Sequence, residues 1–156
     1  MTTEVDEIDR RLLAELQRDA TLSADQLSER TGLSRNACWR RVRRLEDAGV
    51  LTARVALVDA EKLGRGLSVF VIVRTSHHDP DWLRKFRAAV TGFPEITGVY
   101  RMSGDLDYVL RARVADVKGY DRLYQRLIAK VPLSDVSASF VMEEIKETTV
   151  VPVEMR

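Results

Sequence analysis

The stretch SADQLSERTGLSRNACWRRVRRLEDAG, residues 23–49, decides the fold of the N-terminal part of the chain. It predicts two short amphipathic helices with a tight turn between them. Ser23 is a good N-cap for the first helix, and Gln26 completes a capping box with it. Gly32 supplies the permissive backbone that the turn requires, and Ser34 caps the second helix. The pattern predicts a helix-turn-helix.

The second helix, which we expect to end with Gly49 as its C′ residue, has two distinct faces. At 100° per residue, Cys38, Val42 and Leu45 fall on a core face. The other face is polar and cationic, and Trp39 lies at its flank. Its members are Asn36, Arg40, Arg43 and Arg44. Arg41 falls close to the core side, so we interpret it as a structural ion-pair partner and not as a base reader.

The cationic face suits the major groove of double-stranded DNA. Arginine donates two hydrogen bonds to O6 and N7 of guanine, and asparagine pairs in the same way with adenine. Because the turn, the caps and the basic face coincide, we favour DNA binding over the alternative of a solvated basic surface. The residues predicted to contact DNA are Ser34, Arg35, Asn36, Trp39, Arg40, Arg43 and Arg44.

Composition limits the other possibilities. The chain has 156 residues, 45% of them hydrophobic, enough for one ordinary domain or two small ones. It contains no run of 18 apolar residues and no signal-peptide core, so neither a membrane partner nor export is expected. A single cysteine excludes an internal disulfide and favours the cytoplasm.

The net charge of +1 argues against a general polyanion binder. Residues 1–55 contain ten arginines and ten acidic residues, so their formal charges cancel. Since phosphate neutralisation supplies most non-specific affinity, a single copy should bind DNA weakly. We therefore expect two or more copies to act together.

A third helix precedes Ser23, with apolar residues at helical spacing and Asp6 or Thr3 as its cap. We predict three parts: a helix-turn-helix domain over 1–52, a hinge strand and linker over 53–65, and a second domain over 66–156. The hinge strand is based on LTARVALV, residues 51–58, which alternates imperfectly.

The second domain has the periodicity of alternating strands and helices. In order, we predict a strand at 66–75, a helix opened by Asp79-Pro80, strands at 96–103 and 107–115 joined by the turn 104–106, a helix capped by Asp116, and a strand at 136–145. The β-α-β-β-α-β order is that of a ferredoxin-like fold, with both helices on one face of the sheet. The fold class is therefore α+β.

The other face of such a sheet needs either polar residues or a partner. Tyr108, Leu110, Ala112 and Val114 should lie on the helix side of one strand, with Val109, Arg111 and Arg113 opposite. An outward face of mixed apolar and charged residues favours contact with another copy, so we expect a homodimer.

Five segments in this order resemble the Lrp/AsnC family of bacterial and archaeal transcription regulators, over nearly the whole chain. They are VDEIDRRLLAELQRDA (5–20), GLSRNACWRRVRRLEDAGVL (32–51), Leu63-Gly64, SGDLDYVLRARV (103–114) and VMEEIKETTVVP (141–152). The resemblance implies a DNA-binding N-terminal domain and a C-terminal domain that oligomerises and senses a small molecule, typically an amino acid. It also implies dimers that assemble further into tetramers or octamers, with effector bound between dimers.

The resemblance carries over six effector-binding residues: Tyr100, Met102, Gly104, Asp105, Asp107 and Ser139, the last with the least support. An α-amino acid needs a carboxylate for its ammonium group and N–H donors for its own carboxylate. Asp105 or Asp107 meets the first need, and the glycine turn meets the second. Without the resemblance, Gly-Asp-x-Asp is an ordinary turn.

Other readings of the sequence receive little weight. His77-His78 lacks enough partners for a metal site, so we expect neither a metal nor a cofactor. Cys38 is either a redox switch or, as its wheel position favours, a small core residue. One rival function is that of an enzyme like the sirohaem decarboxylases. Its haem-like pocket would need histidine and arginine contributions, whereas here both histidines lie in one loop, and the sequence shows no common catalytic motif. Another rival function is that of a DNA-organising protein that senses no effector.

Overall fold

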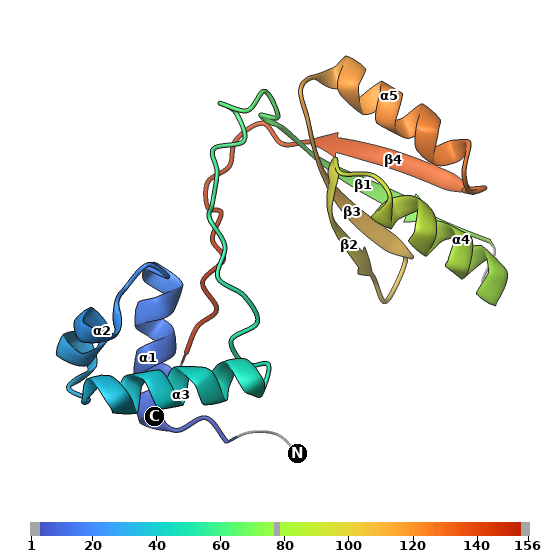
Figure 1. Ribbon diagram of the computed structural model, residues 1–156. Helices are drawn as coiled ribbons and strands as arrows, with labels where there is room; N and C mark the ends of the chain where they lie inside the picture. Colours follow the sequence, from blue (N-terminus) through green and yellow to red (C-terminus); the bar gives the residue numbers. More distant parts are fainter. Residues whose placement is uncertain (1–3, 77–78, 154–156) are drawn as a thin grey trace. The chain divides into compact units, whose positions relative to one another are not determined.

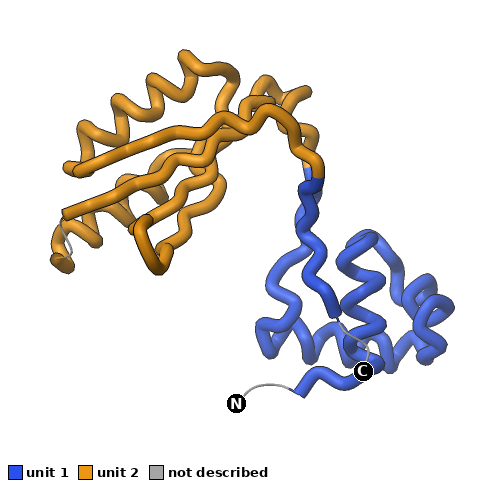
Figure 2. Tube along the Cα trace, turned by 180° about the vertical axis from the view of Figure 1, so that it is seen from behind, with its two compact units in different colours: residues 1–57, 146–156 blue, residues 58–145 orange. Residues whose placement is uncertain are grey.

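The computed structural model describes residues 4–76 and 79–153, so His77 and His78 lie outside the described residues. The chain divides into two compact units, each with its own core (Figures 1 and 2). Unit 1 comprises residues 1–57 and 146–156, and unit 2 comprises residues 58–145. In the described part of the chain, no helix has both the length and the apolar character needed to cross a membrane.

Unit 1 contains the three predicted helices, which are α1 (Glu7–Arg18), α2 (Ala24–Thr31) and α3 (Arg35–Asp47). Ser23 and Gln26 form the predicted capping box, with reciprocal hydrogen bonds of 2.9 and 3.2 Å. Gly32 follows α2 with a φ of 71°, a left-handed conformation that glycine adopts without a Cβ clash. Gly49 has a φ of 69° directly after the C-cap of α3, as predicted for C′. The predicted cap, turn and helix end of the helix-turn-helix are confirmed.

The core of unit 1 is small and lies between the three helices. Its buried members are Leu12, Leu16, Leu22, Leu27, Cys38 and Val42, with Leu33 and Leu51 packed against them. Cys38 is fully buried, and its Sγ lies 3.6 Å from Thr31 Oγ1. The cysteine is therefore a small core residue, as its position on the helical wheel predicted.

Unit 2 is a four-stranded antiparallel sheet with two helices. Its elements are β1 (Leu67–Arg74), α4 (Pro80–Thr91), β2 (Ile96–Arg101), β3 (Tyr108–Val114), α5 (Val117–Ile128) and β4 (Asp135–Phe140). The strand order β2-β3-β1-β4 is that of the predicted ferredoxin-like fold. The predicted caps are confirmed, since Asp79 accepts from the N–H of Trp82 and Asp116 from that of Gly119.

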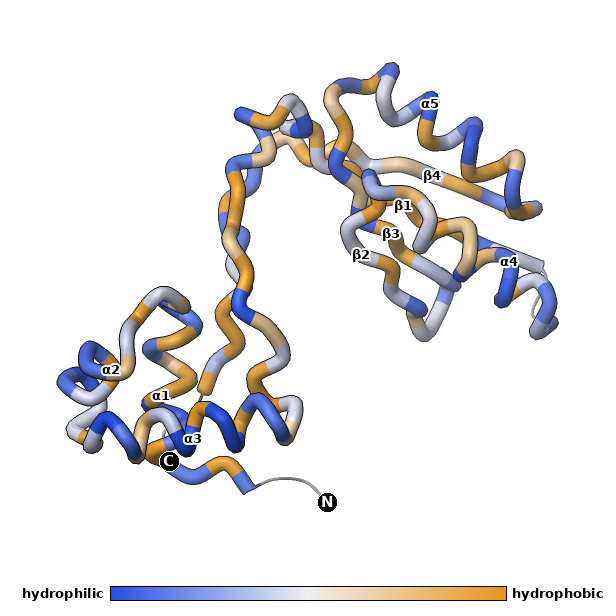
Figure 3. The backbone as a smooth tube through the Cα atoms, in the orientation of Figure 1, coloured by the Kyte–Doolittle hydropathy of each residue, from blue (hydrophilic) through white to orange (hydrophobic). Residues whose placement is uncertain are grey.

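Both helices cover the same face of the sheet. The alternate residues Tyr108, Leu110, Ala112 and Val114 of β3 are buried there, as predicted. Trp82 and Phe86 of α4 stack with ring centroids 5.0 Å apart, and Phe86 reaches Tyr108 at 4.6 Å. α5 contributes Leu123 and Leu127 to the same core. Figure 3 shows the hydrophobic residues concentrated along the strands, whereas α3 of unit 1 is mostly hydrophilic.

The predicted strands of unit 2 differ from the structure by one or two residues at most ends, and larger differences occur at the hinge strand and at the end of the last strand. No strand is assigned between residues 48 and 66, so the hinge strand expected within 53–65 is absent from this described segment. An extended segment becomes a strand only through a hydrogen-bonded neighbour. The chain then turns at residues 60–64, where the carboxylate of Asp59 accepts from the N–H groups of Glu61 and Lys62 at 3.0 and 3.1 Å.

The last strand ends at Phe140 and not at 145. One further backbone bond runs from Val141 N–H to Ser68 O at 2.9 Å. Pairing with β1 stops there because β1 begins at Leu67. The C-terminal segment also groups with unit 1 and not with the second domain. The amide of Gln17 exchanges two hydrogen bonds with the backbone of Val151, at 2.6 and 3.0 Å.

Candidate nucleic-acid interface and effector turn

The N-terminus and outward side of α3 carry the residues predicted to contact DNA. Ser34 caps the helix through its Oγ, which accepts from the N–H of Ala37 at 3.3 Å. All seven predicted residues are exposed, and Trp39 is 67% exposed. Because a large aromatic ring at that exposure has no core role, Trp39 belongs to the outward surface with the arginines.

Two of the α3 arginines form ion pairs with acidic residues of α1. The guanidinium of Arg41 contacts Asp6 at 2.7 Å and Asp9 at 2.9 Å. Arg44 pairs with the second carboxylate oxygen of Asp9. Arg41 is thus the structural ion-pair partner that the sequence predicted. Arg44, placed on the cationic face by the helical wheel, has its guanidinium engaged within the domain.

The charges of this cluster stabilise one another. The backbone N–H of Asp9 and the Arg41 guanidinium lower the pKa of Asp6 to about 2. The carboxylates of Asp6 and Asp9 in turn raise the pKa of Arg41. Since Asp6 is also the N-cap of α1, the cluster joins the start of α1 to the middle of α3.

The remaining arginines of α3 are only loosely held. Arg43 lies 3.7 Å from Asp47 and Arg35 lies 3.5 Å from Asp25, and all four side chains are more than 60% exposed. Exposed pairs of this kind contribute little, so both guanidiniums remain available to a ligand. Among the described residues, no carboxylate lies within ion-pair distance of Arg40.

Sequence reasoning missed Asp9. The signal was present as two pairs with a three-residue spacing, Asp6 and Asp9 on α1 and Arg41 and Arg44 on α3. Such spacing places each pair on one side of its helix. The sequence does not show that the two sides face each other, because that depends on how α3 packs across α1 (Figure 1).

The predicted effector turn follows β2 and leads into β3. Gly104 has a φ of 97°, and the N–H of Met102 donates to Asp107 O at 2.9 Å, which closes the hairpin. Asp107 Oδ2 accepts from the N–H of Thr75 at 2.8 Å, so the turn is tied to the end of β1. Arg74 adds a second tie, donating from Nε to Asp105 O at 3.2 Å.

Five of the six predicted effector residues are brought together. Tyr100 of β2 and Met102 are 49% and 43% exposed beside the turn, Gly104 and Asp105 are exposed in it, and Asp107 is half-buried at its end. Ser139 is exposed on β4, where it pairs with Phe70 near the middle of β1. At sheet spacings it lies roughly 15 Å from the turn, so one chain does not unite it with the other five.

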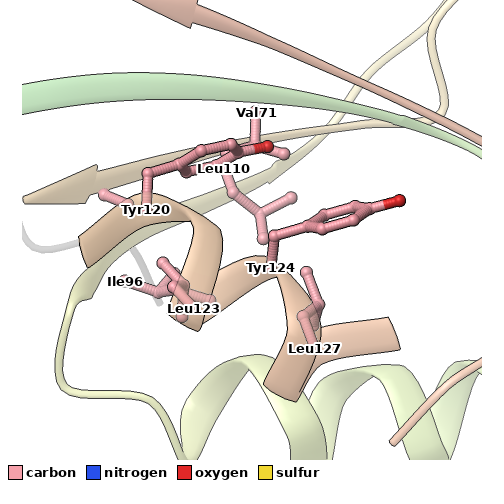
Figure 4. A pocket seen from close by; sticks show the side chains of 8 residues that line it. Val71, Ile96, Leu110, Tyr120, Leu123, Tyr124 and Leu127 are labelled. Atoms are coloured by element: carbon pink, nitrogen blue, oxygen red, sulfur yellow. The ribbon is translucent and has the colours of Figure 1, made fainter. Parts of the chain in front are cut away.

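A small cavity lies between α5 and the sheet, lined by Val71, Ile96, Leu110, Ala112, Tyr120, Leu123, Tyr124 and Leu127 (Figure 4). It holds about 10 Å³, the room of a single water molecule, and its lining is apolar. None of the predicted effector residues lines it. This cavity therefore does not accommodate an amino acid.

The described residues contain no group of three or more metal-ligating side chains. His77 and His78, whose metal-binding potential the sequence gave little weight, lie outside the described residues.

Comparison with known proteins covers both units. Residues 5–52 match the winged helix-turn-helix DNA-binding family, and residues 68–151 match the Lrp/AsnC ligand binding domain. The chain is 51% identical over 151 residues to the DNA-binding transcriptional activator DecR of Escherichia coli, covering 96% of this chain and 99% of that protein.

Two solved structures share the fold over nearly the full length. An AsnC family transcriptional regulator from Agrobacterium tumefaciens has a TM-score of 0.91 and 47% identity, covering 94% of this chain and 96% of its own. A transcriptional regulator from Neisseria meningitidis in complex with L-Met has a TM-score of 0.91 and 33% identity, covering 96% and 97%. These relatives are regulators and not enzymes, which removes the decarboxylase reading. With its exposed helix-turn-helix and its matched ligand-binding domain, the chain belongs to the Lrp/AsnC family of DNA-binding transcriptional regulators.

Proposed function

We propose that this regulator reads specific DNA sequences with the outward face of α3 and that an amino acid bound at the effector turn changes its DNA affinity. The observation that carries the first part is the division of the α3 arginines. Arg40 and Arg43 face outward beside Asn36, whereas Arg41 and Arg44 pair with α1. The outward set provides the hydrogen-bond donors that distinguish guanine and adenine in a major groove.

The contacts of α3 divide by type. Arg40, Arg43 and Asn36 are assigned to base edges, and Ser34 and Arg35 at the start of the helix to phosphates. Trp39 packs against the sugar-phosphate backbone. Arg44 is assigned to the domain's own ion pairs, and not to DNA.

Two or more copies act together. Residues 1–55 have no net charge, so one copy neutralises few phosphates. In a dimer the two α3 helices would enter successive major grooves, roughly 34 Å or a multiple of that apart.

The open face of the sheet is the proposed dimer surface. Phe70 is 40% exposed there, with half-buried Ile72 and Val109 on the neighbouring positions. An antiparallel sheet leaves such residues facing water only at a cost, which a second copy removes. Assembly of dimers into tetramers or octamers follows the family resemblance, and the site of action is the cytoplasm.

The effector is proposed to be an amino acid held by the turn residues, with Asp105 or Asp107 accepting its ammonium group. The L-Met complex of the Neisseria regulator supports this class of ligand. The competing function, a DNA organiser without an effector, makes the same DNA contacts and differs only in its response to small molecules.

The DNA part is tested by selecting bound duplexes from a random library with the full chain and measuring their affinity for Arg40→Ala and Arg43→Ala. If an arginine reads a base, its loss costs about 1–3 kcal/mol on the selected sequence and relaxes the preference at one position. Equal losses on all sequences would make that arginine a phosphate contact. Wild-type DNA affinity in both variants would contradict the assignment of this face of α3 to DNA binding.

The effector part is tested by a thermal-shift screen of the full chain against the common amino acids. A ligand at 100 times its dissociation constant stabilises the native state by about 2.7 kcal/mol. A selective shift accompanied by a change in DNA affinity supports the sensor. No shift with any amino acid favours the DNA organiser.

A further inference from the structure

Asp9 is a fully buried carboxylate in the first turn of α1. Its Oδ1 accepts from Arg41 Nη1 at 2.9 Å, and its Oδ2 accepts from the backbone N–H of Asp6 at 3.1 Å and from Arg44. A buried charge persists only when it is paired and hydrogen-bonded, and both oxygens of Asp9 are. The carboxylate of Asp9 therefore pairs with two arginines of α3.

The four arginines at positions 40–44 form two pairs, of which one forms ion pairs with α1 and the other does not. Arg41 and Arg44, three residues apart, face α1. Arg40 and Arg43, also three residues apart, are displaced by one residue, or about 100° around the helix, and are exposed. A rotation of α3 about its axis would change which pair faces α1, and the ion pairs of Asp9 with Arg41 and Arg44 oppose that rotation.

We propose that Asp9 is a specificity-determining positioning residue for DNA binding. It holds Arg44 away from the phosphates and fixes the rotation of α3 that presents Arg40 and Arg43 to the bases. The inference rests on the proposed DNA contacts of α3. It extends them to a residue of another helix that itself touches no DNA.

Keeping Arg44 paired with Asp9 would help the protein to discriminate its target DNA from other sequences. An arginine on a phosphate strengthens binding to every sequence and steepens the salt dependence by about 0.9 per contact on duplex DNA. Because non-specific sites vastly outnumber target sites in a chromosome, such a contact lowers the useful specificity ratio. Arg44 has a side chain 47% exposed at the edge of the cationic face, so only its pairing with Asp9 keeps it from this role.

The test uses full-length Asp9→Asn, which keeps the shape of the side chain and removes its charge. Fluorescence anisotropy is measured with a labelled 30-bp duplex of random sequence and with the duplex selected by the wild type, over a series of KCl concentrations. We expect the slope of log K against log [KCl] on the random duplex to steepen by about 0.9 for each α3 helix engaged. The ratio of selected to random affinity should fall at least tenfold.

The double variant Asp9→Asn with Arg44→Gln separates this role from a purely structural one. It should return the random-duplex slope to the wild-type value, because the released cation is gone. Glu7→Gln is the matched control, since it removes an exposed charge of α1 whose only ion pair within the described residues is with Arg11, at 3.9 Å on the same helix. Its slope and ratio should stay unchanged.

Unchanged slope and ratio in a folded Asp9→Asn variant would overturn the proposal. If that variant does not fold, Arg44→Gln alone decides: the proposal requires a wild-type slope on random DNA, and a slope shallower by about 0.9 overturns it. Arg40→Ala on the same duplexes reports on the proposed DNA face itself, so failure of the face and failure of the Asp9 role are distinguishable.

Discussion

The carboxylate of Asp107 accepts a hydrogen bond from the backbone N–H of Thr75, with 2.8 Å between Oδ2 and N. Thirty-two residues apart in sequence, the two lie where the effector turn meets the end of β1. Thr75 is 7% exposed, so its amide has little access to water. Asp107 therefore anchors the turn as well as serving as a candidate ligand for an ammonium group.

Substitution at Asp107 should separate these two roles. Asp107→Ala leaves a buried donor without its acceptor and should destabilise unit 2 by about 1–3 kcal/mol. Asp107→Asn retains an oxygen for the Thr75 amide and should cost less than about 1 kcal/mol. Urea unfolding measures both. If the effector's ammonium binds at Asp107, each variant loses the amino-acid thermal shift, and a retained shift in Asp107→Asn would assign the ammonium to another group.

A charge on the open sheet face should prevent dimer formation. Phe70→Asp places a carboxylate among apolar residues that the proposed interface buries, and unpaired buried charges are strongly disfavoured. Light scattering after size exclusion should give the mass of one chain, 17.7 kDa. Val117→Asp is the control, because Val117 is 59% exposed at the start of α5, on the covered side of the sheet. A dimeric Phe70→Asp variant would place the interface elsewhere.

The Asp6 capping cluster should set the acid stability of unit 1. The folded pKa of Asp6 is about 2 and its ordinary value is 3.8, so between these values the unfolded chain binds more protons. The contribution is complete above about pH 5 and is lost as the pH falls toward 2. In Asp6→Asn this part of the pH dependence should disappear. Thermal unfolding between pH 2 and 7, followed by far-UV circular dichroism, measures it, and identical profiles would exclude the role.

Trp39 should report DNA binding directly. It is 67% exposed on α3, so its fluorescence in the free protein should be that of a solvated indole. Contact with the DNA backbone should change both the intensity and the emission maximum. Because Trp82 is buried in unit 2, Trp82→Phe isolates the signal of Trp39. A DNA complex with unchanged Trp39 emission would place this residue outside the interface.

Cys38 should be protected in the folded protein. It is fully buried in the unit 1 core, and a buried thiol reacts only after local or global opening. Its reaction with a thiol reagent should therefore be slow and should accelerate with added urea. Rapid reaction in buffer alone would indicate that unit 1 opens readily.

Much of the local structure was predictable because its determinants lie within a few residues. The caps at Ser23 and Ser34, the turn at Gly32 and the buried alternation of β3 depend on side-chain chemistry and periodicity. The strand that failed, within 53–65, needed a partner that the local pattern could not supply. The end of β4 was missed for the same reason, since β1 determines where pairing stops.

The geometry of α3 was predictable in part. The wheel correctly separated Cys38 from the cationic face, and it identified Arg41 as structural. It placed Arg44 on the outward face, where the side chain is 47% exposed, but a wheel treats the helix as isolated and does not show the ion pair that Arg44 makes with Asp9. The partner of both arginines, Asp9, was missed.

The sequence by itself determined the helix-turn-helix, the β-α-β-β-α-β order and the family, since these depend on spacing along the chain. Only the tertiary structure decided which arginines of α3 form ion pairs with α1, that Asp107 anchors the predicted effector turn to Thr75, and that Ser139 lies apart from that turn. Those facts depend on how helices cross and strands align. Packing brings together groups some thirty residues apart, and the periodicity of a single element carries no information about them.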